Sequence, residues 1–147
     1  VDVSHLNDPG FYDLLEVAQK PFLATHSNAR AVCGHRRNVT DEMIREMVDR
    51  DCLIGLNYFV AFLREDRNVE SLDDLYRHVD HFLSLGAEKC LALGSDFDGA
   101  DLPPCLDGCE KVPELGRYLE EKLGRDTAEK ILWKNAWDFF DRQTQNR

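Results

Sequence analysis

The sequence predicts an α/β domain built on a parallel sheet, and two observations support this. Apolar strand-like runs alternate with amphipathic helical segments along the 147 residues, as in parallel sheets with right-handed crossovers. Three of the apolar runs lead into side chains that can bind metals or transfer protons, at His5, His26 and Asp96. Because the carboxyl ends of parallel strands share one edge of a sheet, we expect these three side chains to lie together.

The first part of the chain contains three predicted strands. Residues 1–5 form the first, residues 21–25 the second, and residues 52–59 the third, which is apolar on both faces as a buried parallel strand is. A helix is expected to follow the turn Asn7–Gly10, and another to follow the N-cap Thr40. These segments give the order strand, helix, strand, helix, strand.

The second part contains one further strand and three helices. Residues 60–69 are expected to form a loop, and Ser71 caps the next amphipathic helix. Residues 89–93 form the fourth predicted strand. After a loop rich in proline, glycine and cysteine, one helix is expected over residues 113–123 and another from about Asp126.

Composition limits the classes of function. The net charge of −10 argues against nucleic-acid binding, which needs a basic surface. No run approaches the ~18 apolar residues of a membrane helix, so we expect no membrane segment. The five cysteines are odd in number and widely spaced, which favours reduced thiols over a disulfide framework or a small metal site. We expect a cytoplasmic protein whose true N-terminus, with any targeting signal, lies upstream of Val1.

His5 and His26 are candidate metal ligands. They lie 21 residues apart, which is one strand–helix unit. Two neutral imidazoles suit zinc, although a hydrolytic site also needs carboxylates. The alternative is that one or both histidines are strand-end residues bonded to the backbone. Asp96 is a candidate metal ligand, base or substrate anchor, or it forms the turn together with Asp98.

Other polar residues have plainer interpretations. Asp2 alternates with His5 along the strand and is expected to be structural. His78 and His81 lie on an amphipathic helix and are expected to face solvent or an interface. The pair at Arg36 and Arg37 is either a surface ion pair or a carboxylate clamp, because arginine binds carboxylates in a bidentate manner.

At these residues the sequence resembles the membrane (renal) dipeptidase family of zinc metallopeptidases. The resemblance runs through essentially the whole chain, in motif order and in spacing. It rests on four linked motifs, namely Asp2–His5, Thr25–Asn28 with Ala31, Arg36–Val39 followed by Asp41, and Gly94–Gly99.

The resemblance implies a (β/α)8 metal-dependent hydrolase barrel with two zinc ions at the carboxyl ends of its strands. It implies that His5 and His26 bind one zinc ion and that Arg37 grips the carboxylate of the substrate. Asp96 matches the aspartate beside the substrate's free amino group, which is also proposed to assist protonation of the leaving nitrogen. The implied reaction is the hydrolysis of dipeptides by a metal-bridging hydroxide.

Three features of the family pattern belong to the first half of the barrel, upstream of the four matched motifs: the first metal motif His-x-Asp, the bridging glutamate, and the histidine thought to stabilise the oxyanion. We therefore expect residues 1–147 to be a single incomplete domain, the C-terminal half of the barrel with about strands 5–8. Alone, this half is expected to bind zinc weakly or not at all and to be inactive. Its expected partners are a dipeptide substrate and either the missing N-terminal half or a second copy of the chain.

Two other interpretations stay open. One is a diverged, non-catalytic α/β module that binds a small molecule or a partner. The other is a flavodoxin-like domain. It is the weaker alternative because no glycine-rich phosphate loop follows the first strand.

Overall fold

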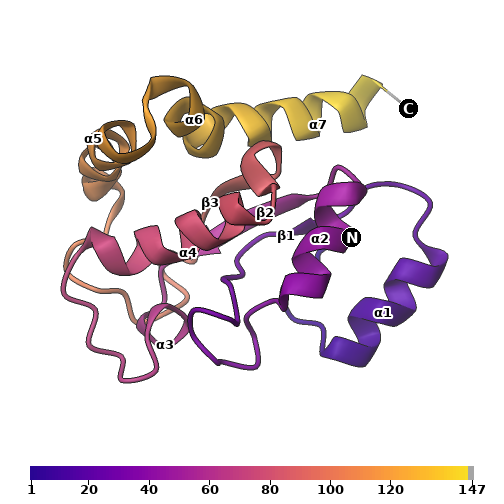
Figure 1. Cartoon of the computed structure of the whole chain (residues 1–147), viewed down its shortest axis with the longest axis horizontal. Helices are drawn as coiled ribbons and strands as arrows, with labels where there is room; N and C mark the ends of the chain where they lie inside the picture. Colours follow the sequence, from indigo (N-terminus) through magenta and orange to yellow (C-terminus); the bar gives the residue numbers. More distant parts are fainter. Residues whose placement is uncertain (146–147) are drawn as a thin grey trace.

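The computed structural model describes residues 1–145, and a three-stranded parallel sheet forms its centre (Figure 1). The strands β1 (Leu23–Ala24), β2 (Leu53–Asn57) and β3 (Leu91–Ser95) lie side by side in that order. The predicted parallel α/β arrangement is confirmed for these strands. Residues 1–5 add only a single parallel bridge, between Asp2 and Leu23.

The first predicted strand is short because the chain turns at Ser4. The Asp2 carboxylate accepts a hydrogen bond from the Ser4 N–H at 3.0 Å, and the Leu6 N–H donates to the Val3 carbonyl at 2.9 Å. A turn of this kind removes the extended backbone that a longer ladder would need.

The three helices predicted before the fourth strand are confirmed, and each begins at a side-chain cap. They are α1 (Asp8–Val17), α2 (Asp41–Asp49) and α4 (Leu72–Ser84). The side chains of Asn7, Thr40 and Ser71 accept backbone N–H groups of their first turns, which stabilises each start by about 1 kcal/mol.

The C-terminal region is helical, as predicted, but its boundaries differ. Helix α5 (Val112–Leu123) follows a 3₁₀ turn η2 (Cys109–Lys111) and ends at Gly124, whose φ is 79°. The last helical segment begins one residue before Asp126 and has three parts, with a π-helical turn in the middle. These are α6 (Arg125–Glu129), η3 (Lys130–Lys134) and α7 (Asn135–Gln145). Within residues 1–145, no helix is long and apolar enough to cross a membrane.

Two further predictions were wrong in detail. Residues 60–69 were predicted to be a loop, yet they contain a helical turn, α3 (Val60–Leu63), in which Ala61, Phe62 and Leu63 are buried. Burial of this apolar run outweighs the cost of a short helix. Strand β3 begins two residues later than predicted, because η1 (Ala87–Lys89) takes up the chain after the left-handed Gly86.

The two faces of the sheet are covered by different helices. Ile54 and Leu56 pack into the large core shared with α2, α4 and α5. Leu53 and Ala92 form a smaller cluster with Phe139 of α7. Figure 1 shows α7 above the sheet and α4 below it. This alternation is the period of two expected of a strand with both faces buried.

Two glycines allow the chain to pass closely over the sheet beside the site. A Cβ atom at Gly55 would lie 2.1 Å from the Thr25 carbonyl oxygen, and one at Gly94 would lie 2.0 Å from the same oxygen. Neither strand therefore accepts a side chain here without moving the backbone of Thr25. This close approach fixes the position of the loop that begins at Thr25 relative to β2 and β3.

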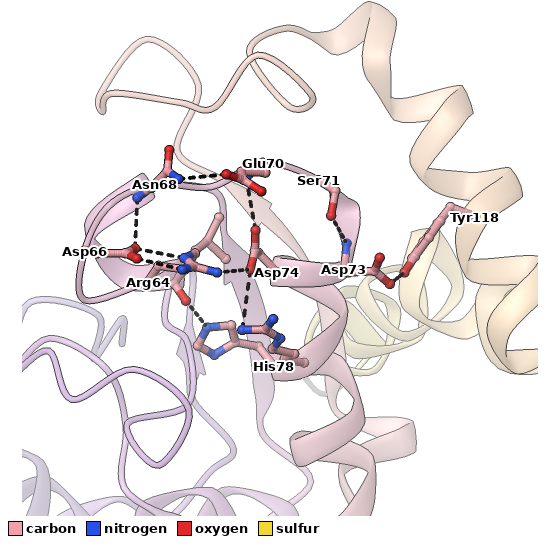
Figure 2. A network of polar contacts seen from close by, with 11 residues as sticks. Arg64, Asp66, Asn68, Glu70, Ser71, Asp73, Asp74, His78 and Tyr118 are labelled. Atoms are coloured by element: carbon pink, nitrogen blue, oxygen red, sulfur yellow. Dashed lines mark hydrogen bonds and ion pairs between the residues drawn. The ribbon is translucent and has the colours of Figure 1, made fainter.

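His78 was expected to face solvent or an interface, and this was wrong, because the residue is fully buried. Its Nδ1 accepts the Ala29 N–H at 3.2 Å, and its Nε2 lies 3.1 Å from the Leu63 carbonyl, to which it donates. Figure 2 shows the His78 ring and the second of these bonds. These two hydrogen bonds to the backbone satisfy both ring nitrogens of the buried imidazole. The helical periodicity of the sequence did not indicate them. His78 thus joins α4 to the loop after β1 and to α3.

A network of charges stands above His78 in Figure 2. Arg64 bonds Asp66 at 2.6 Å and the buried Asp74 at 3.1 Å. Asp74 also accepts the Glu70 N–H at 3.1 Å. The network joins the segment between α3 and α4 to the first turn of α4, beside the histidine.

Substitution of Gly55 by alanine is expected to lower the free energy of unfolding by about 2 kcal/mol or more, because the new Cβ overlaps the Thr25 carbonyl. Gly116→Ala is the matched control. Gly116 lies within α5, and a Cβ there would be 3.5 Å from the Leu132 side chain. Alanine at this position should raise the free energy of unfolding by about 0.5–1 kcal/mol through its higher helix propensity. Urea unfolding measures both, and equal effects of the two variants would contradict the close approach.

His78 should make the fold sensitive to acid. Burial lowers the pKa of His78 to about 4 from its ordinary value of 6.5. Between these values the unfolded chain binds the proton more readily, so stability is complete above pH 6.5 and falls as the pH drops towards 4. The expected loss is roughly 2–3 kcal/mol between about pH 7.5 and about pH 4.5. His78→Gln should reduce this loss in urea unfolding at the two pH values, and an unchanged pH dependence would count against it.

Candidate active site

The carboxyl ends of the three strands open into one cleft of about 530 Å³. His5, His26, Arg37 and Asp96, the four residues predicted from the sequence, all line it. The remaining lining residues are Phe59, Phe62, Asp98, Gly99, Ala100 and Asp101. The structure thus brings the predicted residues together, and their chemical roles stay predictions.

The two histidines face each other across the gap between the N-terminal segment and β1. Their Nε2 atoms lie 3.0 Å apart, with ring centroids at 4.9 Å and planes inclined by 64°. Two imidazole nitrogens on a tetrahedral zinc ion, each ~2.0–2.1 Å from the metal, are about 3.3 Å apart. A small opening of the pair would therefore accommodate one ion.

A chain of hydrogen bonds orients the His26 ring. The Thr25 hydroxyl donates to Asp2 Oδ2 at 2.6 Å, which leaves its oxygen to accept the Nδ1–H of His26 at 2.7 Å. In this arrangement Nδ1 carries the proton, and the lone pair of Nε2 is directed towards His5. A carboxylate behind a ligating histidine is a common support of metal sites, here with the threonine hydroxyl between the two.

Asp2 is structural, as predicted. Its carboxylate accepts the backbone N–H groups of Ser4 and Thr25, each at 3.0 Å, in addition to the Thr25 hydroxyl. Burial raises the pKa of Asp2, but these hydrogen bonds outweigh burial and hold it below the ordinary value. The carboxylate is therefore ionised at neutral pH and ties the N-terminal segment to the end of β1.

The imidazole of His26 is held neutral. Burial lowers its pKa most, the negative charge of Asp96 opposes this, and the net shift is downward. A metal binds the neutral form of histidine. The site therefore needs little or no proton release from His26 at neutral pH.

Arg37 is anchored beside the histidines. Its Nε and Nη2 donate to the Ser4 carbonyl at 3.0 and 2.6 Å, and its guanidinium carbon lies 5.6 Å from the centre of the Phe62 ring. Among the described residues these bonds use two of its five N–H groups, so the outer end of the fork remains available to a carboxylate. Arg36 lines a different hollow, beside Pro9.

Asp96 lies in a strained turn after β3. The backbone is left-handed at Ser95, Asp96 and Asp98, with φ of 27°, 72° and 62°. The Gly99 N–H donates to the Asp96 carbonyl at 3.1 Å and closes the turn. Aspartate tolerates this region better than most residues, yet three such residues in four are unusual. Asp98 is exposed at the edge of the cleft.

Two buried residues that support the site, Asn28 and Asn57, were not predicted from the sequence. Both are fully buried, and the Asn28 side chain bonds the backbone N–H and carbonyl of Asn57. A signal was present for Asn57, because it ends the apolar run Leu53–Leu56 just as His26 follows another such run. Asparagine was passed over because it is neither an acid nor a strong metal ligand.

Comparison with known proteins identifies the family to which the chain belongs. The family model described as "Membrane dipeptidase (Peptidase family M19)" matches residues 1–146. The chain belongs to the membrane dipeptidase family. The resemblance predicted from the four motifs is thus confirmed, and membership in a family of metallopeptidases implies dependence on a metal.

Two curated relatives show how much of the chain is matched. The "uncharacterized protein in pqqA 5′ region" of Klebsiella pneumoniae is 40% identical over 140 residues, which cover 92% of this chain and 51% of the relative. An uncharacterised dipeptidase of Schizosaccharomyces pombe is 31% identical over 124 residues, or 83% of this chain and 30% of that protein.

Solved structures agree with the computed fold. A metallopeptidase from Rhodobacter sphaeroides, liganded with a phosphinate mimic of the dipeptide L-Ala-D-Ala, superposes with a TM-score of 0.91 at 32% identity. A second structure, the dipeptidase AC of family M19, gives 0.90 at 32% identity. Each match covers 96% of this chain but only 41% and 43% of those chains. The chain therefore spans about half, or less, of the length of its relatives.

The donor set within this chain is partial. Among residues 1–145, no three histidine, cysteine, aspartate or glutamate side chains gather closely enough to hold a metal ion. The five cysteines are free thiols, as predicted. His5 and His26 thus offer two donors, and a complete site needs further ones.

Removal of the Thr25 hydroxyl should weaken metal binding through His26. Thr25→Val keeps the shape of the side chain but leaves Nδ1 without its acceptor, so the affinity for Zn²⁺ should fall about 10–100-fold. Thr25→Ser keeps the hydroxyl and serves as the control. Competition with a chromophoric chelator measures the affinity after the chain is combined with the rest of the barrel, and equal affinities in both variants would show that the relay does not support the ligand.

Proposed function

We propose that this chain forms the C-terminal half of a zinc-dependent dipeptidase, with about strands 5–8 of a (β/α)8 barrel. The observation that carries the proposal is the shared cleft, in which two imidazoles 3.0 Å apart lie with an anchored arginine and a carboxylate at the ends of parallel strands. Catalytic sites of α/β barrels occupy this edge of the sheet. Family membership over residues 1–146 adds independent support.

His5 and His26 would hold one zinc ion through their Nε2 atoms. The spacing of these atoms and the proton on Nδ1 of His26 fit this role. When bound, zinc supplies a polarised carbonyl and an activated hydroxide at neutral pH. The other ligands, including those of a second ion, would come from residues outside this chain.

Arg37 and Asp96 would hold the two ends of a dipeptide. The outer fork of Arg37 suits the C-terminal carboxylate, and Asp96 suits the ammonium group at the other end. A cleft of about 530 Å³ lies in the range of small-molecule sites. Asp96 lines the same cleft as His26, and its charge acts to raise the pKa of that histidine. A carboxyl group in this cleft that has taken up a proton would be the candidate to protonate the leaving nitrogen.

The exposed surface of η3 and α7 favours association with the other half of the barrel. Trp133, Trp137 and Phe140 follow at spacings of four and three and are 54%, 68% and 53% exposed. Together with Ala136 they line an apolar hollow. Monomeric proteins seldom expose so many aromatic side chains on one helix. The rest of the relatives' length would cover this stripe, and a second copy of the chain is the other candidate.

The decisive experiment measures zinc content, assembly state and hydrolysis of alanyl dipeptides, for this chain alone and after mixing with the upstream half encoded by the same gene. We expect little or no hydrolysis alone and zinc-dependent hydrolysis in the mixture. Robust hydrolysis by the chain alone would show that the ligand set is wrong. Absence of zinc and of hydrolysis in a folded mixture would support the non-catalytic binding module instead.

Arg37→Lys should raise KM for dipeptides about tenfold with a smaller change in kcat, because lysine offers a point charge in place of the planar fork. Arg36→Lys is the matched control, since Arg36 lines another hollow, and it should leave both constants unchanged. Steady-state kinetics of the assembled enzyme measures the two variants. Similar effects at both positions would mean that general charge, and no specific clamp, recognises the substrate.

A further inference from the structure

Asn57 ends β2 directly beneath the cleft, and its side chain is bonded at every polar atom. Its Nδ2 donates to Asp96 Oδ2 at 3.0 Å and, more weakly, to the His26 carbonyl at 3.5 Å. Its Oδ1 accepts the Phe59 N–H at 2.6 Å. The residue is fully buried. One amide therefore contacts the segments that carry the candidate ligand, the candidate acid and the aromatic wall of the cleft.

The backbone of Asn57 is fixed by a second amide. Asn28 Oδ1 accepts the Asn57 N–H and Asn28 Nδ2 donates to the Asn57 carbonyl, both at 2.9 Å. The Asn28 side chain thus replaces a neighbouring strand at this point. Because Asn28 follows His26 by two residues, the same pair of bonds also sets the position of the histidine loop.

An irregularity in the strand pairing orients the Asn57 side chain towards Asp96. The register between β2 and β3 shifts between Leu56 and Asn57, so that Asn57 pairs with Ser95. Irregularities of this kind re-orient side chains beside active sites. Asp96 itself has a left-handed backbone with φ of 72°, a conformation that persists where surrounding groups hold it. The Asn57 amide is such a group.

The two oxygens of Asp96 have different surroundings. Oδ2 accepts the Asn57 amide, whereas Oδ1 lies over Gly99, where an added Cβ would come within 2.7 Å of it. Asn57 therefore commits one oxygen and leaves the other to a ligand in the cleft.

We propose that Asn57 is the positioning residue for Asp96, holding Oδ2 so that Oδ1 meets the ammonium group of the substrate. The inference rests on the proposed dipeptidase function and deepens it by assigning recognition of the free amino group to an Asn57–Asp96 pair. A carboxylate that is already oriented loses less conformational freedom on binding. The pair should therefore discriminate between substrates with and without the amino group.

The functional test compares L-alanyl-L-alanine with propionyl-L-alanine, which lacks only the amino group, in the assembled enzyme. Asn57→Asp keeps the shape and the acceptor for Phe59 but loses the donor, and Asn57→Ala removes the donor without adding charge. In both variants KM for the dipeptide should rise about tenfold, the cost of a misplaced charge-assisted hydrogen bond, while kcat changes less. The preference for the free amine should fall by the same factor.

Asn135→Ala is the matched control, because Asn135 is another buried asparagine, bonded to the Glu88 and Leu91 carbonyls away from the cleft. It should lower Tm and leave the substrate preference unchanged. If the Asn57 variants lower Tm but keep the wild-type preference, Asn57 is merely structural and the proposal is wrong.

A spectroscopic test is independent of activity and of the folding of the Asn57 variants. In the ¹H–¹⁵N spectrum of the unaltered chain, the side-chain amide of Asn57 should exchange slowly with solvent. In Asp96→Ala, one of its two protons should shift upfield and exchange faster, whereas the Asn135 amide should not change. An unaltered Asn57 signal would overturn the proposal. If the amide responds as expected but the assembled wild-type enzyme hydrolyses no dipeptide, the dipeptidase function fails and the Asn57–Asp96 bond stands.

Discussion

The site depends on where the peptide that follows β1 lies. The Thr25 carbonyl rests against Gly55 and Gly94, at distances that exclude a Cβ on either strand. The N–H and hydroxyl of the same residue bond Asp2, and the hydroxyl oxygen accepts from the His26 ring. One residue thus links the sheet, the N-terminal segment and the candidate ligand, so a shift of its backbone would move all three.

Buried polar side chains fix the loops that apolar packing leaves undetermined. Asn28 and Asn57 bond across the end of β2, and His78 joins the loop after β1 to α3. Asn38 adds two bonds from its Nδ2, to the Cys33 and Phe62 carbonyls. Each of these groups would be costly to bury without its partners. They therefore favour one arrangement of the loops over others of similar apolar contact.

The sequence predicts best those features that depend on local pattern. The N-caps Thr40 and Ser71 and the stop at Gly124 follow from their own neighbours in the chain, and the structure agrees with them. Long-range partners were predicted poorly. Helical periodicity could not indicate that His78 meets two backbone groups far away in the sequence.

The candidate site was predictable to a similar extent. Strand ends share an edge, so the proximity of His5, His26 and Asp96 followed from topology alone. The different surroundings of the two Asp96 carboxylate oxygens did not follow from topology. They depend on a register shift and on Asn57, whose side chain is neutral. The short first strand was missed for a related reason, since its end is set by the Asp2 side chain, which accepts the backbone N–H of Ser4.

The single bridge between Asp2 and Leu23 has a consequence for metal binding. His5 stands on a segment held to β1 by a few hydrogen bonds, whereas His26 stands in the loop that directly follows β1 of the buried sheet. An ion shared by the two rings would act as a clasp between a loosely attached edge and a firm one. Thermodynamic linkage then requires that anything which orders the N-terminal edge also tightens the grip on the ion, and that the ion orders the edge in return.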